Sequence, residues 1–262
     1  MPAFNQKVVI VTGGARGIGR GIGLAFAREG ARVLCADMDD QTGARFVSES
    51  AGLAGEIRFQ HADVSQSRDC QGLVNTAVSM WGTVDVLCNN VGIQPTTSYA
   101  AAHELPEEAW DRIINVNLKS CFLMTKYCVP VMKQHGGGVI INTASVQGLQ
   151  SMKGVSAYAA SKGGLLSLTR QLALEYAEDH IRVLAVNPGT IDTPLVDEAI
   201  RYVGGDEQSI RQQYARAHPL GRIGQPDEVA QVVLFLASEK ASFMTGEYVT
   251  VDGGMMAKGA WA

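Results

Sequence analysis

A tyrosine and a lysine stand four residues apart in the segment YAASK, residues 158–162. On a helix, positions i and i+4 lie on one face, about 5–6 Å apart at Cβ, so Tyr158 and Lys162 point the same way. A free phenol has a pKa of about 10, which is too high for a base near neutral pH. A cation one turn away stabilises the phenolate, and a positively charged cofactor ring would add to this effect. The pair therefore predicts a general acid/base that moves an alcohol proton while a cofactor takes the hydride.

A serine strengthens this prediction, because a tyrosine and a lysine at helical spacing are also common on helix surfaces. Ser145 precedes Tyr158 by thirteen residues and ends the predicted strand 138–145. Ligands of parallel sheets bind at the carboxyl ends of the strands. A hydroxyl at that place can bond the substrate oxygen and hold it against the phenol.

The turn between the first predicted strand and the helix that follows it is rich in glycine, in the segment TGGARGIG, residues 12–19. They let the backbone turn sharply and approach a pyrophosphate at the helix N-terminus. The spacing Gly-x-x-x-Gly-x-Gly differs from the G-x-G-x-x-G fingerprint, so the prediction depends on the strand before the loop and the helix after it. The candidate cofactor-binding residues of this loop are Gly13, Arg16, Gly17, Ile18 and Gly19.

Asp37 ends the second predicted strand, eighteen residues after Gly19. A carboxylate there accepts hydrogen bonds from both ribose hydroxyls of NAD and repels the 2′-phosphate of NADP. Met38 follows it at a position where a basic residue would favour NADP. Arg16 in the glycine loop is the nearby cation that would favour NADP. The simpler alternative is an aspartate that starts a turn. We predict NAD as the cofactor.

Seven short β-branched segments alternate with segments of helical period and must position these residues. The predicted strands are residues 7–12, 31–37, 57–63, 84–90, 138–145, 181–188 and 247–254. Most are continuously apolar, as buried parallel strands are, and the first helix has an apolar stripe at Ile18, Ile22, Ala25 and Phe26. The pattern predicts an α/β protein. We expect a single-domain, doubly wound Rossmann-type parallel sheet of about seven strands, with helices on both faces, over residues 1–262.

Residues 190–225 depart from this alternation, because the segment is polar and contains Gly204 and Gly205. It leaves the carboxyl end of a strand, where a ligand would bind, so we predict a substrate lid. An ordinary surface excursion is the alternative.

Composition excludes several classes of protein. The net charge of −4 carries no basic stripe for nucleic acid, and no apolar window is long enough to span a bilayer. The N-terminus lacks the features of an export signal, so we expect a cytoplasmic protein. Histidine and cysteine form no metal-type cluster, and we expect no metal. We interpret the cysteines as small buried apolar residues: Cys35, Cys70, Cys88, Cys121 and Cys128.

Several segments in a fixed order resemble one known family, the short-chain dehydrogenase/reductases, over nearly the whole chain. Val91 departs from the family pattern, which usually has alanine there. The segments are TGGARGIG (12–19), Asp63-Val64, Asn89-Asn90-Val91-Gly92, IINVNLKS (113–120), Tyr158 with Lys162, and Asn187-Pro188-Gly189 with Thr193.

The resemblance implies roles for individual residues. Tyr158 would be the acid/base and Ser145 would orient the substrate oxygen. Lys162 would lower the phenol pKa and bind the nicotinamide ribose, and Asn117 would fix a water that links Lys162 to solvent. Cofactor contacts outside the glycine loop would come from Asp63, Val64, Asn90, Gly92, Tyr158, Lys162, Pro188, Gly189, Ile191 and Thr193.

The substrate is predicted from the residues that follow two of these segments. We expect Gln94 and Gln147 to bind it with Ser145 and Tyr158, and two glutamines favour a sugar, a polyol or another small hydroxylated compound. Solvated glutamines at the mouth of the pocket are the alternative. Further residues expected to face the pocket are Gln150, Met152 and His218.

Assembly is predicted from the helix after Tyr158, which is apolar on two sides. Leu165, Leu168 and Leu172 form one stripe, and Leu166, Ala173 and Ala177 form another. A helix buried on two sides needs a second partner, which agrees with the homotetramers of the family. Trp261 near the C-terminus is a candidate contact to a neighbouring site.

Two other functions remain open. One is an NADPH-dependent reductase of carbonyls or 3-oxoacyl carriers. The other is a cofactor-sensing or scaffold protein that keeps the fold without catalysis.

Overall fold

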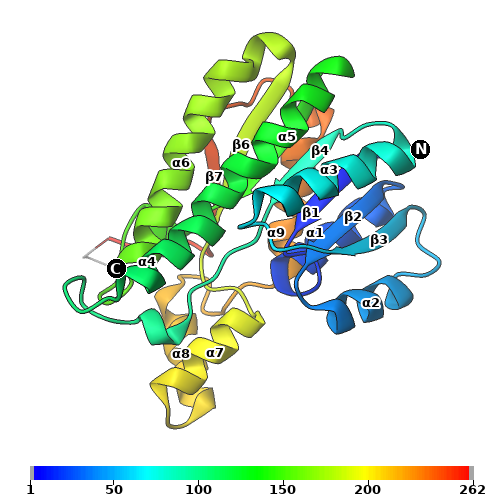
Figure 1. The fold of residues 1–262 in the computed structure, drawn as a ribbon. Helices are drawn as coiled ribbons and strands as arrows, with labels where there is room; N and C mark the ends of the chain where they lie inside the picture. Colours follow the sequence, from blue (N-terminus) through cyan, green and yellow to red (C-terminus); the bar gives the residue numbers. More distant parts are fainter. Residues whose placement is uncertain (1–2, 260–262) are drawn as a thin grey trace.

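Seven strands form one parallel sheet in the order β3-β2-β1-β4-β5-β6-β7 in the computed structural model, which describes residues 3–259 (Figure 1). All seven predicted strands are present, and their ends differ from the predicted ones by at most three residues. This confirms the predicted doubly wound α/β fold. The strands are β1 Val8–Thr12, β2 Arg32–Asp37, β3 Glu56–His61, β4 Val86–Asn89, β5 Gly138–Thr143, β6 Ile181–Pro188 and β7 Tyr248–Val251.

Helices cover both faces of the sheet because its central strands are apolar on both sides. Val9 and Val11 of β1 pack into one layer, and Val8 and Ile10 pack into the other. The first layer holds α1 Gly17–Arg28, α2 Asp40–Glu49 and α9 Pro226–Ala237. The second holds α3 Ser67–Trp81, α5 Ser120–Gln134 and α6 Ser156–Tyr176. A short helix, α4 Glu107–Ile114, runs into α5 through a π-helical turn at Asn115–Lys119.

The order of the strands reverses at β1, which pairs with β2 on one side and with β4 on the other. The loops after these strands diverge and leave a crevice at their carboxyl ends, where ligands of open α/β sheets bind. Most of the predicted site residues follow the ends of β1 to β6.

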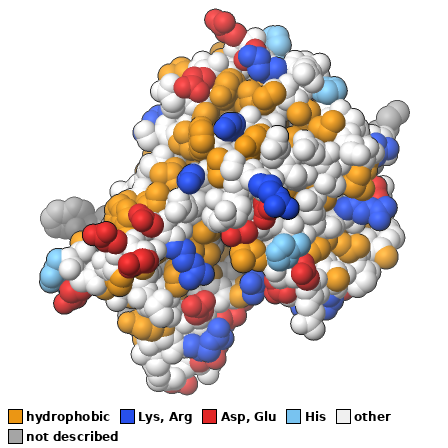
Figure 2. Space-filling view, viewed as in Figure 1, with side chains coloured by type: hydrophobic (Ala, Val, Ile, Leu, Met, Phe, Trp, Pro, Cys, Tyr) orange, Lys and Arg blue, Asp and Glu red, His pale blue; other side chains and the backbone are white. Residues whose placement is uncertain are grey.

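The segment predicted as a lid contains two helices, α7 Pro194–Val203 and α8 Glu207–Ala217, which project from one end of the molecule (Figure 1). Each buries a single residue, Ile200 in α7 and Ile210 in α8. Acidic and basic side chains lie side by side over this lobe (Figure 2). Arg211 on α8 donates to the carboxylates of Asp192 and Asp197, so ion pairs hold much of the lobe together.

Helix α6 requires a correction to the argument about assembly. Leu172 and Ala173 pack against the sheet layer, while Leu165 and Leu166 pack against Cys121 of α5. Both apolar stripes are therefore largely covered within the chain, because Ala144 and Ala185 at β5 and β6 belong to the same cluster as Leu165 and Leu166. The two stripes alone do not require a partner subunit. Trp261 lies outside the described residues.

The five cysteines are buried and free, as expected for residues that fill the core. Burial raises the pKa of both Cys35 and Cys70 to about 12. None of the described helices is long and apolar enough to cross a membrane. Among residues 3–259, no group of three His, Cys, Asp or Glu side chains is arranged to hold a metal ion.

Candidate active site

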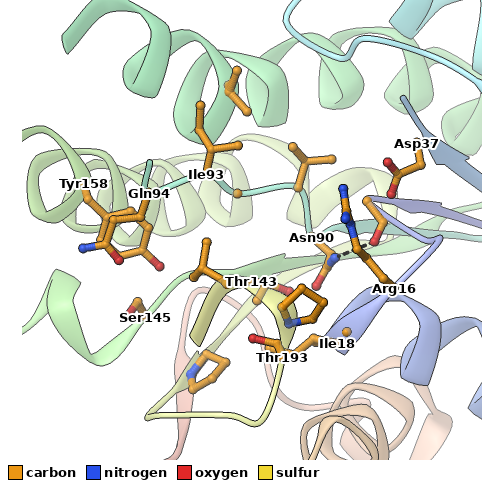
Figure 3. A pocket seen from close by; sticks show the side chains of 18 of the residues that line it. Arg16, Ile18, Asp37, Asn90, Ile93, Gln94, Thr143, Ser145, Tyr158 and Thr193 are labelled. Carbon is orange, nitrogen blue, oxygen red and sulfur yellow. Dashed lines mark hydrogen bonds between the residues drawn. The ribbon is translucent and has the colours of Figure 1, made fainter. Parts of the chain in front are cut away.

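A cavity of about 710 Å³ opens at the carboxyl ends of the strands and collects most of the predicted site residues. Tyr158, Gln94 and Ser145 lie at one end, and Arg16 and Asp37 lie at the other (Figure 3). The predicted residues that line it are Gly13, Arg16, Gly17, Ile18, Asp37, Asp63, Val64, Asn90, Gly92, Gln94, Ser145, Tyr158, Lys162, Pro188, Gly189, Ile191 and Thr193.

The glycine loop has the geometry that a bound pyrophosphate needs. Gly13 and Gly17 have φ of 64° and 54°, a region that favours glycine. Arg16 is the N-cap of α1, and its side chain makes no capping hydrogen bond, so the first N–H groups of the helix remain available to an anion. A Cβ at Gly17 would lie 3.2 Å from the Thr193 side chain, across the cavity mouth. These features fit the phosphates of a dinucleotide.

Gly19 is a partial exception to the predicted cofactor contacts, because it does not line the cavity. A Cβ there would overlap the carbonyl oxygen of Gly13 and lie 2.6 Å from Asn90 Nδ2. Asn90 Nδ2 in turn donates to the main-chain oxygens of Thr12 (3.1 Å) and Gly13 (3.2 Å). Gly19 and Asn90 therefore shape the loop: Gly19 lets the helix pack beneath it, and Asn90 fastens it to the end of β4.

Asp37 lies at the opposite end of the cavity from Tyr158 (Figure 3). Its carboxylate accepts from the main-chain N–H groups of Ala15 (3.2 Å), Met38 (2.8 Å) and Asp39 (3.2 Å). Two carboxylate oxygens offer about four acceptor positions, so acceptor capacity remains for a ribose hydroxyl. The side chain of Arg16 is more than half exposed and lies 3.9 Å from the Asp39 carboxylate.

Tyr158 and Lys162 both lie on the first turns of α6, and both are buried. Lys162 Nζ donates to the main-chain oxygen of Thr143 at 2.8 Å and lies 5.6 Å from the centre of the Tyr158 ring. A Cβ at Gly92 would lie 3.1 Å from Nζ, so the absence of a side chain there makes room for the lysine. The ammonium group points inward, toward the site, as the predicted role requires.

The pKa values of this pair differ from the sequence-based expectation. Burial raises the pKa of Tyr158, while the hydrogen bond with the Ser145 hydroxyl acts in the opposite direction. Burial lowers the pKa of Lys162 to about 8. Nζ is directed at the Thr143 carbonyl and not at the phenol oxygen, so the lysine charge does not offset the burial of the phenol. Within the chain alone, burial keeps the pKa of Tyr158 above its ordinary value.

Ser145 is held by the turn that follows β5. Its Oγ accepts from the main-chain N–H of Gln147 at 3.1 Å. The Gln147 side chain does not line the cavity, contrary to the prediction, because the 3₁₀ turn Val146–Gly148 directs it toward Met152, whose Sδ lies 3.7 Å from its amide nitrogen. Gln147 thus acts through its backbone.

Asn117 lies in the π-helical turn and is fully buried behind the cavity wall. Its carboxamide accepts from the N–H of Ile93 (2.8 Å) and donates to the Ile93 oxygen (2.9 Å) and to Ser161 Oγ (3.2 Å). Through these bonds the side chain of Asn117 ties the loop after β4 to α6. The water that Asn117 would fix stays a prediction.

His218, Gln150 and Met152 do not line this cavity. His218 lines a separate cavity of about 280 Å³, and its Nδ1 bonds the main-chain oxygen of Asp252 at 2.5 Å. Its ring packs against Gly189, where a Cβ would lie 2.7 Å from His218 Cε1. The histidine thus supports the Pro188–Gly189 turn from behind.

Sequence reasoning missed several residues of the cavity wall. Thr143 contributes the carbonyl that holds Lys162, and Ile93 and Val116 border the cavity from the loop after β4 and the π-helical turn. Helix α7 adds Leu195, Val196 and Glu198. The position of Thr143 at the end of β5 is a signal that could have indicated it. No local signal indicates which face of a lid helix turns inward.

Comparisons with known proteins agree with this arrangement. A family model described as enoyl-(acyl carrier protein) reductase matches residues 13–256. Cyclohexanol dehydrogenase of Acinetobacter sp. (strain SE19) is 39% identical over 255 residues, which cover 97% of each chain. The 3-oxoacyl-[acyl-carrier-protein] reductase FabG of Thermotoga maritima is 40% identical over 250 residues, which cover 95% of this chain and 98% of FabG.

Solved structures show the same similarity. The aldohexose dehydrogenase of Thermoplasma acidophilum superimposes with a TM-score of 0.89 at 35% identity, covering 99% of this chain and 97% of that one. Family members are oxidoreductases that use a nicotinamide cofactor, and the cavity described above has the residues for one. The chain belongs to the short-chain dehydrogenase/reductase family.

Proposed function

We propose that the protein interconverts a secondary alcohol and the corresponding carbonyl compound with NAD as cofactor. One observation carries the proposal: a single cavity joins Ser145 and Tyr158 to the uncapped N-terminus of α1 and to Asp37. The first two residues suit the proton of an alcohol, and the other two features suit a dinucleotide without a 2′-phosphate.

The chain's own residues divide the chemical work. Ser145 Oγ holds the substrate oxygen, and the Tyr158 hydroxyl exchanges a proton with it. A nicotinamide cofactor, when bound, would supply or accept the hydride, and the positive charge of its oxidised form would favour the Tyr158 phenolate. Lys162, whose Nζ lies 5.6 Å from the centre of the Tyr158 ring, would bind the nicotinamide ribose. Leu195 and Val196 of the lid form an apolar wall that limits water at the reacting end.

The choice of NAD is tested at Asp37. In Asp37→Asn the amide oxygen can still accept from the main-chain N–H groups of Met38 and Asp39, but the oxygen that accepts from Ala15 is replaced by an NH₂ group and the negative charge is gone. We expect the wild-type kcat/KM to be at least about a hundredfold higher with NAD⁺ than with NADP⁺, and the ratio to fall at least about tenfold in the variant. A wild-type preference for NADP⁺ would contradict the assignment.

A small hydroxylated substrate is supported by Gln94 and by the names of similar proteins. Gln94 is buried in the reacting end of the cavity, with its amide nitrogen free of any partner among the described residues. Cyclohexanol dehydrogenase and aldohexose dehydrogenase are named for a cyclic alcohol and for a sugar. A sugar, a polyol or a small cyclic alcohol is therefore the substrate class that we propose.

An NADPH-dependent reductase of carbonyls or 3-oxoacyl carriers is the second candidate. It is favoured by the similarity to FabG and by Arg16, an exposed cation at the Asp37 end of the cavity. Rates of ketone and 3-oxoacyl thioester reduction with NADPH and NADH separate the two candidates. The second candidate would be favoured if, with NADPH, the thioester were reduced faster than any simple ketone.

The substrate class is tested by a screen of cofactor reduction across sugars, polyols, hydroxy acids and secondary alcohols. We expect NAD⁺ to be reduced fastest with neutral hydroxylated compounds. Activity confined to bulky apolar alcohols would contradict the proposed class.

A homotetramer in the cytoplasm completes the proposal. Support comes from apolar side chains that remain exposed, which are Leu174 on α6 and, on other elements, Phe235, Phe243 and Tyr248. Five free buried thiols suit a reducing compartment. Light scattering tests the assembly: the wild type should have four times the mass of the chain, and Phe243→Asp should lower it.

A further inference from the structure

Gln94 is a buried polar side chain at the reacting end of the cavity, and one of its hydrogen-bonding groups has no partner in the part of the chain that the structure describes. It is 7% exposed, and its amide nitrogen has no hydrogen-bond partner among residues 3–259. The side chain lies at the same end of the cavity as Tyr158 and Ser145 (Figure 3). A buried amide without a partner costs about 1–3 kcal/mol, so a ligand atom that bonds it is favoured over one that does not.

Glu198 brings a carboxylate to the same cavity from the lid. It lies on α7, and its neighbours Leu195 and Val196 on that helix are apolar parts of the wall. No Lys or Arg nitrogen of the described residues lies within 4.0 Å of its carboxylate. Burial raises the pKa of Tyr99 to about 12, and the charges of nearby tyrosines and of Glu198 contribute to this rise. Glu198 is thus an unpaired negative charge that acts on the substrate side of the site.

Among the described residues, the cations that line the cavity are Arg16, Arg112 and Lys162, and no nitrogen of these side chains lies within 4.0 Å of the Glu198 carboxylate. Arg16 lies at the opposite end, beside Asp37 (Figure 3). Lys162 is buried behind Gly92, and Nζ donates to the Thr143 carbonyl. A carboxylate on the substrate would therefore be repelled by the charge of Glu198, which forms no ion pair with a Lys or Arg of the described residues, whereas a hydroxyl could donate to Glu198.

We propose that Gln94 and Glu198 determine specificity for uncharged substrates that carry a second hydroxyl beside the reacting carbinol. Gln94 bonds this second oxygen, and Glu198 accepts its hydrogen and disfavours acidic substrates. The inference rests on the proposed function and narrows its substrate class.

Two pairs of small substrates test the inference. Butane-2,3-diol is compared with butan-2-ol, and methyl 3-hydroxybutanoate with 3-hydroxybutanoate, each oxidised with saturating NAD⁺. Gln94→Leu should lower kcat/KM at least about tenfold for the diol, mainly through KM, and less than about threefold for the mono-alcohol. Glu198→Gln should raise kcat/KM about tenfold for 3-hydroxybutanoate relative to its methyl ester.

Matched variants report non-specific effects. Gln150→Leu and Glu178→Gln make the same chemical changes at exposed positions that do not line the cavity, and they should leave both substrate ratios unchanged. Equal losses on both members of a pair in the Gln94 variant, or an unchanged ester-to-acid ratio in the Glu198 variant, would overturn the inference and leave the proposed function intact. Failure of the wild type to oxidise the diol would overturn the inference alone, whereas failure to oxidise every alcohol of the wider screen with NAD⁺ or NADP⁺ would overturn the proposed function as well.

Discussion

Lys162 is a cation that the fold stabilises poorly. It is 2% exposed, and burial lowers its pKa to about 8. Its partner is a neutral carbonyl, that of Thr143, rather than a carboxylate. A buried charge without an opposite charge reduces stability, and such residues are concentrated at functional sites. The lysine is thus better explained by catalysis than by folding.

The pH dependence of stability tests this explanation. The pKa of Lys162 is about 8 in the folded protein and about 10.5 in the unfolded chain. Between these values the unfolded chain binds one proton more, so the free energy of unfolding rises as the pH rises from 8 to 10.5. Lys162→Met removes the effect. We expect the variant to gain stability relative to the wild type at pH 7, and the difference to shrink by about 2 kcal/mol between pH 7 and pH 9.5.

Denaturant unfolding of both proteins at one protein concentration gives this difference. Lys126→Met, at an exposed lysine of α5, serves as the control and should show no such change with pH. A difference for Lys162→Met that is constant with pH would contradict the buried, shifted lysine.

The junction of β1 and α1 depends on the absence of a side chain at Gly19. In Gly19→Ala the new Cβ would overlap the Gly13 carbonyl and press on Asn90, so the glycine loop must move. We expect a loss of about 1–3 kcal/mol in stability and at least about a tenfold weaker cofactor affinity. Chemical unfolding and fluorescence titration with NADH measure the two effects.

Gly72→Ala in the middle of α3 is the matched control. Among the atoms considered there, the new Cβ would meet one side-chain nitrogen, Gln60 Nε2, at 3.8 Å. The substitution should stabilise the protein by about 0.5–1 kcal/mol and leave cofactor affinity unchanged. Equal behaviour of the two variants would show that the close packing at Gly19 is unimportant.

The lid lobe, α7 and α8, has few buried residues and is stabilised mainly by ion pairs, most of which involve Arg211. The guanidinium bonds Asp192 and Asp197 and reaches Glu207 at 3.1 Å. Exposed ion pairs contribute about 0–1 kcal/mol each, so Arg211→Gln should lower Tm only slightly. Since α7 forms part of the cavity wall, we expect KM for the alcohol to rise at least about fivefold. A large fall in Tm with unchanged KM would contradict a separate lid.

At the scale of the whole molecule, the features that could be predicted from the sequence are those with a regular periodicity, the strands and the helices. Buried parallel strands are continuously apolar, so all seven were found, and their carboxyl ends placed Asp37, Asn90 and Ser145 in one crevice. The helical spacing placed Tyr158 and Lys162 on one face.

The rest depends on irregular segments whose direction no period fixes. A single 3₁₀ turn directs Gln147 away from the cavity, and the loop after α8 places His218 behind Gly189. Asn117 was assigned by family resemblance, yet its bonds to Ile93 become visible only in three dimensions. Glu198 could not be found from sequence, because its place in the wall depends on how α7 packs over the site.

The central claim is that the Tyr158 hydroxyl transfers the proton in a site that Ser145 and Lys162 complete. Its most direct test is kcat for alcohol oxidation by Tyr158→Phe, with Tyr176→Phe at the far end of the same helix as the control. We predict a loss of about a thousandfold for Tyr158→Phe with NADH affinity changed less than about threefold, and near wild-type turnover for the control. A Tyr158→Phe enzyme that retains more than about a tenth of wild-type kcat would contradict the account.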